Sequence, residues 1–158
     1  MTSKFTNETK RRSKKIYFNK VDENIKTFGY HTTAVAEEVN FTPFTYSTGL
    51  FENFEIPELF ISGLGPNLSS QIIKNYSEKY KFNEIPLNKK IDDLIDTFPV
   101  YFIKVDNDDL KEYVLSSIKF YENKNYEYLQ VVFPDLNGKF PNDQNYKYDQ
   151  KIMGKFEI

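Results

Sequence analysis

The segment "PFTYSTGLFENFEIPELFISGLGP", residues 43–66, contains two strand-like runs separated by a linker. The runs cover residues 43–48 and 57–63, and both are rich in the aromatic, β-branched and aliphatic residues that favour strands. The linker "GLFENFEI" is longer than a tight hairpin turn needs. Polar side chains also occur inside both runs, where a buried strand needs packing residues. We therefore expect this segment to form part of a sheet and part of a candidate site.

The residues before this segment predict one short helix and one more strand. Val21, Ile25 and Phe28 follow helical spacing, and Gly29 stands where a helix C-cap would lie. Residues 30–38, "YHTTAVAEE", have the threonine and valine content of a strand. The predicted order is therefore a helix followed by three strands.

The residues after this segment predict alternating helices and strands. Pro66 opens a helix, because proline at the first helical position sacrifices no hydrogen bond. The "GLGPN" turn before it lacks the glycines of a dinucleotide-binding loop and the lysine of a P-loop, so we expect an ordinary turn. The remaining expected elements are a short helix over 87–98, an interior strand over 99–105, a helix with the apolar stripe Leu110, Tyr113, Val114, Ile118 and Tyr121, and a strand over 126–133.

This order predicts an α+β fold, with a single sheet of about five strands and helices packed on it. The chain of 158 residues is 39% hydrophobic and 28% charged, which is enough to bury the core of one domain. We place that domain at residues 19–158. Its 12 Tyr and 15 Phe make aromatic rings a large part of the core.

The charge of the chain is divided unequally. Residues 1–20 contain seven Lys or Arg and one acidic residue, whereas the remaining residues have a net charge of −8. We expect residues 1–18 to form a basic, mobile N-terminal arm, with "KRRSKK" from Lys10 to Lys15 as its centre. Contact with nucleic acid is not expected beyond this arm, because the body is acidic.

Several kinds of site are excluded or disfavoured by composition. The chain has no cysteine, which removes disulfides and thiolate chemistry, and its single histidine is His31. A metal would therefore depend on carboxylates, and we expect no metal and no cofactor. No apolar run is long enough to span a bilayer, so we expect a cytoplasmic protein with no membrane partner.

Three ordered motifs carry a resemblance to a known family. They are "FTYSTGL" with Tyr46, Thr48, Gly49 and Leu50; "IPELFISGL" with Pro57, Glu58, Gly63 and Leu64; and "LQVVFPDLNGKFP" with Leu129, Gln130, Pro134, Asp135, Gly138 and Pro141. Together they resemble the bacterial family named domain of unknown function 4262, over roughly residues 20–155. Asn142 and Lys151 depart from the Trp and Pro that the family often has. The resemblance implies a fold and a shared surface but no reaction.

Alternation along the three strands predicts which side chains share a face. Phe44, Tyr46 and Thr48 project together, as do Glu58, Phe60 and Ser62, and likewise Tyr128, Gln130 and Val132. If the strands are neighbours, a phenol, a hydroxyl, a carboxylate and an amide surround one pocket. The alternative is that these groups satisfy one another or nearby backbone, with Glu58 capping a turn.

Two functional hypotheses follow. The first is a non-catalytic module that binds a small molecule or a protein through a polar-aromatic pocket, with Tyr46, Thr48, Glu58, Gln130, Asp135 and His31 as candidate ligand-binding residues. The second is a hydrolase in which Glu58 or Asp135 acts with His31 as acid and base, because a histidine titrates near neutral pH.

Overall fold

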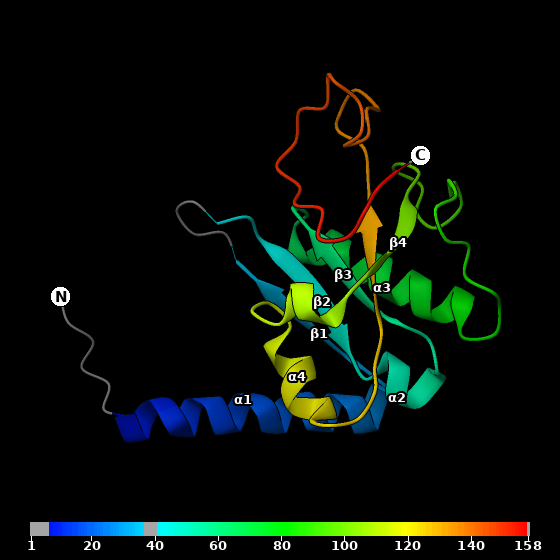
Figure 1. Cartoon of the computed structure of the whole chain (residues 1–158). Helices are drawn as coiled ribbons and strands as arrows, with labels where there is room; N and C mark the ends of the chain where they lie inside the picture. The colour runs from blue at the N-terminus through cyan, green and yellow to red at the C-terminus, as the bar shows by residue number, and fades with distance from the viewer. Residues whose placement is uncertain (1–6, 37–40, 158) are drawn as a thin grey trace.

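A five-stranded mixed sheet forms the centre of the protein in the computed structural model, which describes residues 7–36 and 41–157 (Figure 1). Its strands are β1 (His31–Val35), β2 (Phe44–Thr48), β3 (Glu58–Ser62), β4 (Tyr101–Val105) and β5 (Tyr128–Val132). The helices are α1 (Asn7–Phe28), α2 (Leu50–Phe54), α3 (Pro66–Tyr80) and α4 (Leu115–Tyr121), with a 3₁₀ turn, η1, at Asn107–Leu110. The predicted α+β class and single sheet are confirmed.

The strand order in the sheet is β1-β2-β3-β5-β4. The pairs β1–β2, β2–β3 and β4–β5 are antiparallel, whereas β3 and β5 are parallel. A parallel pair needs a long crossover, and the chain between these two strands contains α3, β4 and α4. The two strands predicted within residues 43–66 are therefore adjacent, and the last strand of the chain lies beside the second of them.

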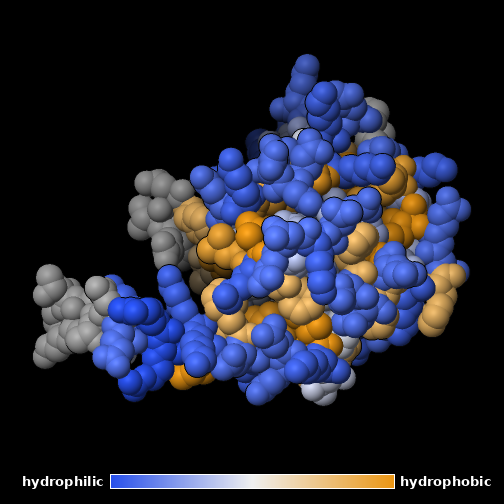
Figure 2. Space-filling view, turned by 60° about the horizontal axis from the view of Figure 1, so that its bottom comes forward, coloured by the Kyte–Doolittle hydropathy of each residue, from blue (hydrophilic) through white to orange (hydrophobic). Residues whose placement is uncertain are grey.

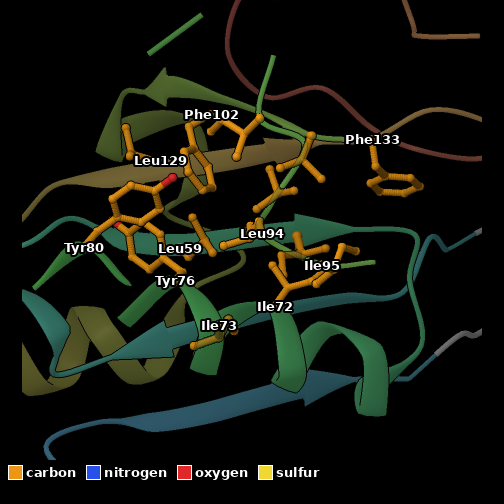
Figure 3. Packing of buried hydrophobic residues seen from close by; sticks show 14 of the residues in the cluster. Leu59, Ile72, Ile73, Tyr76, Tyr80, Leu94, Ile95, Phe102, Leu129 and Phe133 are labelled. Atoms are coloured by element: carbon orange, nitrogen blue, oxygen red, sulfur yellow. The ribbon is translucent and has the colours of Figure 1, made fainter. Parts of the chain in front are cut away.

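One face of the sheet packs on α3 through apolar and aromatic side chains (Figure 3). Ile72, Ile73 and Tyr76 on α3 are fully buried against Leu59 and Leu129 of the central strands. Helical spacing on α3 and alternation on the strands place all five on facing surfaces. This face supplies most of the dry core.

The opposite face is covered by α1, η1 and α4 and is more polar. Its apolar cluster contains Tyr46, Phe60 and Tyr128 from the sheet, together with Leu110 and Val114 from the segment before α4. Helix α1 contacts both β1 and α4. The predicted site residues of the central strands belong to this face.

Helix α1 is longer than the predicted helix near Val21 and begins at Asn7. The basic cluster Lys10 to Lys15 is therefore helical, which suits lysine and arginine because their straight side chains favour helices. Of the expected N-terminal arm, residues 1–6 lie outside the described residues. Independent motion of the arm stays a prediction.

The helix predicted over 87–98 is wrong. Ile91 forms an isolated bridge with Val100, and the Asn88 N–H donates to the carbonyl of Phe102 at 2.9 Å. The segment pairs its backbone with Val100, just before β4, and with Phe102 in β4 instead of within itself. Its apolar side chains at Ile91 and Leu94 are buried all the same, so helical spacing identified core residues but not their conformation.

Strand β4 is an edge strand and not the interior strand that its sequence predicts. Phe102 packs on the tyrosines of α3, while Tyr101 on the other face contacts the rings of Phe140 and Phe156. The irregular C-terminal segment therefore covers one face of β4 and α3 covers the other. Burial on both faces does not require a central place in the sheet.

The single helix predicted over Leu110 to Tyr121 is wrong in its continuity. The chain forms η1 and then α4, and Val114 between them has φ −91° and ψ 55°, outside the helical region. The stripe remains buried at Leu110, Val114 and Tyr121.

Among residues 7–36 and 41–157, no helix combines the length and apolar character that crossing a bilayer requires.

Candidate functional site

Strand register brings most of the predicted site residues to one face of the sheet. Tyr46 pairs with Phe60, and Phe60 pairs in turn with Gln130 of β5. Glu58 pairs with Tyr128, and Thr48 pairs with His31 of β1. Paired residues of neighbouring strands project to the same side. This face, beneath α1 and α4, therefore holds His31, Tyr46, Thr48, Glu58 and Gln130.

The carboxylate of Glu58 is fully buried on this face. The residue has no exposed area, yet its two oxygens accept hydrogen bonds from several donors at once. The donors are the Ser47 hydroxyl at 2.7 Å, the backbone N–H groups of Gly49, Leu50 and Phe51 at 2.9, 3.2 and 3.1 Å, and the Tyr121 hydroxyl. A buried charge is tolerated only when it is paired or hydrogen-bonded in this way.

The site for this carboxylate exists because β2 and β3 separate after Tyr46. Beyond that residue, the Leu59 N–H donates to the Ser47 side-chain oxygen at 2.9 Å. The chain then turns into α2 through Gly49, which has φ 109°. A Cβ atom at Gly49 would lie 2.9 Å from the carbonyl oxygen of Gly29, so this turn needs glycine. The unpaired N–H groups that open α2 then point at Glu58.

Burial raises the pKa of Glu58, and the donors of Tyr121, Ser47 and the backbone oppose that shift. The pKa of the Tyr121 phenol is raised as well, first by burial and then by the nearby charge of Glu58. The phenol therefore keeps its proton at neutral pH and acts as a donor. The pair is a hydrogen-bonded phenol and carboxyl group inside the protein.

A second set of hydroxyls lies beside this pair. The side-chain oxygens of Thr48 and Ser117 are 2.6 Å apart, and Ser117 lies 2.7 Å from the Tyr128 hydroxyl. Ser117 and Tyr128 both donate to the carbonyl of Ser47, at 3.1 and 2.7 Å. These contacts attach α4 to β2 and β5.

Tyr46 attaches the start of α4 to the sheet. Its hydroxyl accepts a hydrogen bond from the backbone N–H of Ser116 at 3.0 Å, and the residue is 2% exposed. The first N–H groups of a helix have no partner within it, so the phenol of Tyr46 acts as a cap. Nearby, the hydroxyl of Tyr17 on α1 lies 2.8 Å from that of Thr33 on β1.

Gln130 lies on the same face but binds a different part of the chain. Its amide nitrogen donates to the carbonyl of Lys151 at 2.6 Å, and its oxygen accepts from the Met153 N–H at 2.7 Å. Phe60 stands between Gln130 and Tyr46 in the paired row. The amide therefore fixes the C-terminal segment and does not join the Glu58 cluster.

Asp135 lies apart from the face, in the turn after β5. It accepts hydrogen bonds from the backbone N–H groups of Asn137 and Lys139 at 2.9 Å, and from Lys147 at the same distance.

His31 is half-buried, with its Nδ1 atom 2.9 Å from the amide nitrogen of Asn24. Burial, and then the charge of Lys20, lower the pKa of this histidine.

A cleft that sequence reasoning missed opens beside this cluster, where β4 ends and β3 and β5 begin. It encloses about 330 Å³ and is lined by Lys104, Asp106, Asn107, Tyr126 and Glu127 over an aliphatic floor. Most of these residues lie in connecting segments or at strand ends. Their meeting depends on strand order, for which the sequence carries no signal.

Within the described part of the chain, no three His, Cys, Asp or Glu side chains are grouped to hold a metal ion.

One wall of the cleft is in contact with the Glu58 cluster. The Tyr126 ring stacks on the Tyr121 ring, with centroids 4.8 Å apart and planes 17° from parallel. Tyr121 in turn donates its hydroxyl to Glu58. The Asn107 amide donates to the Tyr126 carbonyl at 2.8 Å, which fixes the opposite side of this residue. The polar cluster therefore supports a cleft wall without opening into the cleft.

We predict that Glu58→Gln destabilises the fold by about 2 to 4 kcal/mol, because an amide offers one acceptor oxygen where several donors converge and leaves others unsatisfied. Urea unfolding at pH 5 measures this change. The matched control is Glu52→Gln, since Glu52 lies on the surface with Lys124 3.5 Å away and should change stability by less than about 0.5 kcal/mol. Equal effects of the two substitutions would contradict a structural role for Glu58.

The same pair of proteins should differ in pH dependence. Because the pKa of Glu58 is raised above its ordinary value of 4.5, the folded state binds this proton more tightly than the unfolded state does. The stability that Glu58 contributes is therefore present in full at a pH below its pKa in the unfolded state. It decreases as the pH rises through the raised pKa of Glu58 in the folded state. We expect the stability difference between wild type and Glu58→Gln to shrink from pH 4.5 to 8. A difference that grows over this range would mean that the donors outweigh burial.

Comparison with known proteins identifies a family but no function. The family model described as domain of unknown function (DUF4262) matches residues 24–147, which include all five strands, α2, α3 and α4. No curated protein and no solved structure gives a significant match. The match covers well over half of the chain and agrees with the three sequence motifs. The protein therefore belongs to the DUF4262 family.

Proposed function

We propose that the protein is a non-catalytic binding module whose ligand occupies the cleft at the ends of β3, β4 and β5. The observation that carries this proposal is the contact between the cleft and the buried cluster through Tyr126 and Tyr121. A cleft of about 330 Å³ is within the range of small-molecule sites. The wall at Tyr126 is fixed by ring stacking and hydrogen bonds to the folded body, so the cleft keeps its shape before a ligand binds. Such preorganisation lowers the cost of binding.

The lining of the cleft favours a small amphiphilic ligand. Lys104 offers a cation, and Asp106 and Glu127 offer carboxylates. Ile85 and Leu87 provide an apolar surface beside them. A compound with an anionic group, a hydrogen-bond donor and a flat apolar part would match this distribution.

Three of the polar residues predicted from the sequence, Tyr46, Thr48 and Glu58, support the cleft in this proposal and do not touch the ligand. Glu58 and Tyr121 fix the wall, and Tyr46 and Thr48 fix α4, which carries Tyr121. All of these groups use their hydrogen bonds inside the protein. Their place in the function is to position Tyr126.

The hydrolase hypothesis has less support. A general acid or base must come within hydrogen-bond reach of its substrate. Glu58 has no exposed area, and Asp135 is engaged by three backbone N–H groups. The imidazole of His31 lies against Asn24, on the strand at the far edge of the sheet from the cleft.

A thermal-shift screen with amino acids, nucleotides, sugars and small carboxylic acids tests this proposal. We expect a ligand that raises the melting temperature by mass action, and Lys104→Ala should weaken its binding at least tenfold by removing the cation from the cleft. Lys74→Ala, an exposed lysine on α3, is the matched control and should bind as wild type does. Amide NMR shifts that map the ligand away from β4 and β5, or a flat response across the screen, would contradict the proposal.

A further inference from the structure

The N-terminal half of α1 stands out from the body of the protein as a basic helix. Figure 2 shows it as a mostly hydrophilic projection beside the folded domain, with one apolar patch on its lower side. All side chains from Lys10 to Ile16 are exposed, and the first fully buried side chain of α1 is Val21. This part of the helix therefore contributes almost nothing to the core.

Four cations lie on one side of this projecting segment. Lys10, Arg11, Lys14 and Lys15 occupy positions i, i+1, i+4 and i+5, which share one helical face over about two turns. Arg12 lies off this face and pairs with Glu8 at 3.7 Å. Among the described residues, the four face cations have no ion-pair partner.

A segment of this kind needs a partner to explain its charge. Helices in proteins gain most of their stability from packing an apolar face, and this segment packs none. Like charges at i and i+4 also repel, at Lys10 with Lys14 and at Arg11 with Lys15. An anionic surface would remove this repulsion, and the acidic body of the chain would confine the contact to the projecting helix.

We propose that the face formed by Lys10, Arg11, Lys14 and Lys15 docks into the major groove of duplex DNA. An α-helix with its side chains is about 10 to 12 Å wide, which matches the major groove of B-form DNA. Residues 8–16, which project from the body, extend about 13 Å, at about 1.5 Å per residue, so no other element has to enter the groove. The deep, narrow major groove of A-form RNA does not admit such a helix.

A membrane surface fits this helix poorly. A helix that lies in a lipid interface needs a continuous apolar face opposite its basic one. Ile16 is the one large aliphatic residue between Lys10 and Ile16, and it is 64% exposed. Apart from Ile16, the projecting segment is polar around its circumference, which suits phosphate contacts in water.

Fluorescence anisotropy with a labelled 20-base-pair DNA duplex and the full chain tests the proposal. Four phosphate contacts predict that log K falls with log salt concentration at a slope of about −4, so affinity drops about a hundredfold between roughly 50 and 200 mM salt. The variant K10A/R11A/K14A/K15A should bind at least tenfold more weakly at about 50 mM salt, with a slope near zero. Because these side chains are exposed, its melting temperature should equal that of wild type.

The matched control removes four exposed lysines of the body, in the variant K74A/K89A/K90A/K111A. We expect it to bind DNA as wild type does, and a duplex RNA of the same sequence to bind more weakly than the DNA. Absence of wild-type binding at about 50 mM salt, or equal loss in both variants, would overturn the proposal. Equal affinity for the RNA duplex would overturn groove docking. Displacement of DNA by poly-L-glutamate at equal charge concentration would instead point to an acidic protein.

Discussion

The buried carboxylate of Glu58 is the interaction on which the polar half of this structure depends. It lies where β2 and β3 separate, and it collects the first N–H groups of α2, the Ser47 hydroxyl and the phenol of Tyr121. Removing a carboxylate from water costs several kcal/mol, and these donors offset only part of that cost, since burial still raises the pKa of Glu58. A single side chain thus fixes the end of β2, the start of α2 and the position of α4.

This arrangement explains why the two faces of the sheet differ. The α3 face is stabilised mainly by buried apolar area, through close-packed Leu, Ile and aromatic side chains. On the other face, α4 has only seven residues and could not be stable by itself. It is positioned by hydrogen bonds between Ser116 and Tyr46, between Ser117 and Thr48, and between Tyr121 and Glu58. Ser117 and Tyr121 are four residues apart and therefore point to the same side.

The sequence predicts the strands and helices whose periodicity coincides with their burial. Strands β2 and β3 and helix α3 have this property, and alternation also placed Tyr46, Thr48, Glu58 and Gln130 on one face. The prediction of secondary structure failed where a segment forms its backbone hydrogen bonds with a distant part of the chain instead of within itself. Residues 87–98 have helical spacing, yet their backbone pairs with β4. Strand β4 looks central because the C-terminal segment, which has no periodicity, covers one of its faces.

The sequence predicted the shared face of the polar side chains but not the geometry around them, and their role as ligand-binding residues stays a prediction. Alternation shows which side chains share a face, but it does not show whether the space between them is empty or filled. Here Ser116, Ser117 and Tyr121 of α4 fill that space, and the cleft opens beside it. The lining residues Asp106 and Tyr126 meet because β4 and β5 are neighbours, which no local pattern encodes.

Native-state hydrogen exchange of the Gly49, Leu50 and Phe51 amides tests the role of Glu58 most directly. A five-residue helix beside the surface would ordinarily exchange its first amides quickly, because helix termini fray. If the buried carboxylate holds them, their protection should match that of the Leu59 and Ile61 amides in β3. Fast exchange at these three amides in a folded protein would contradict the account.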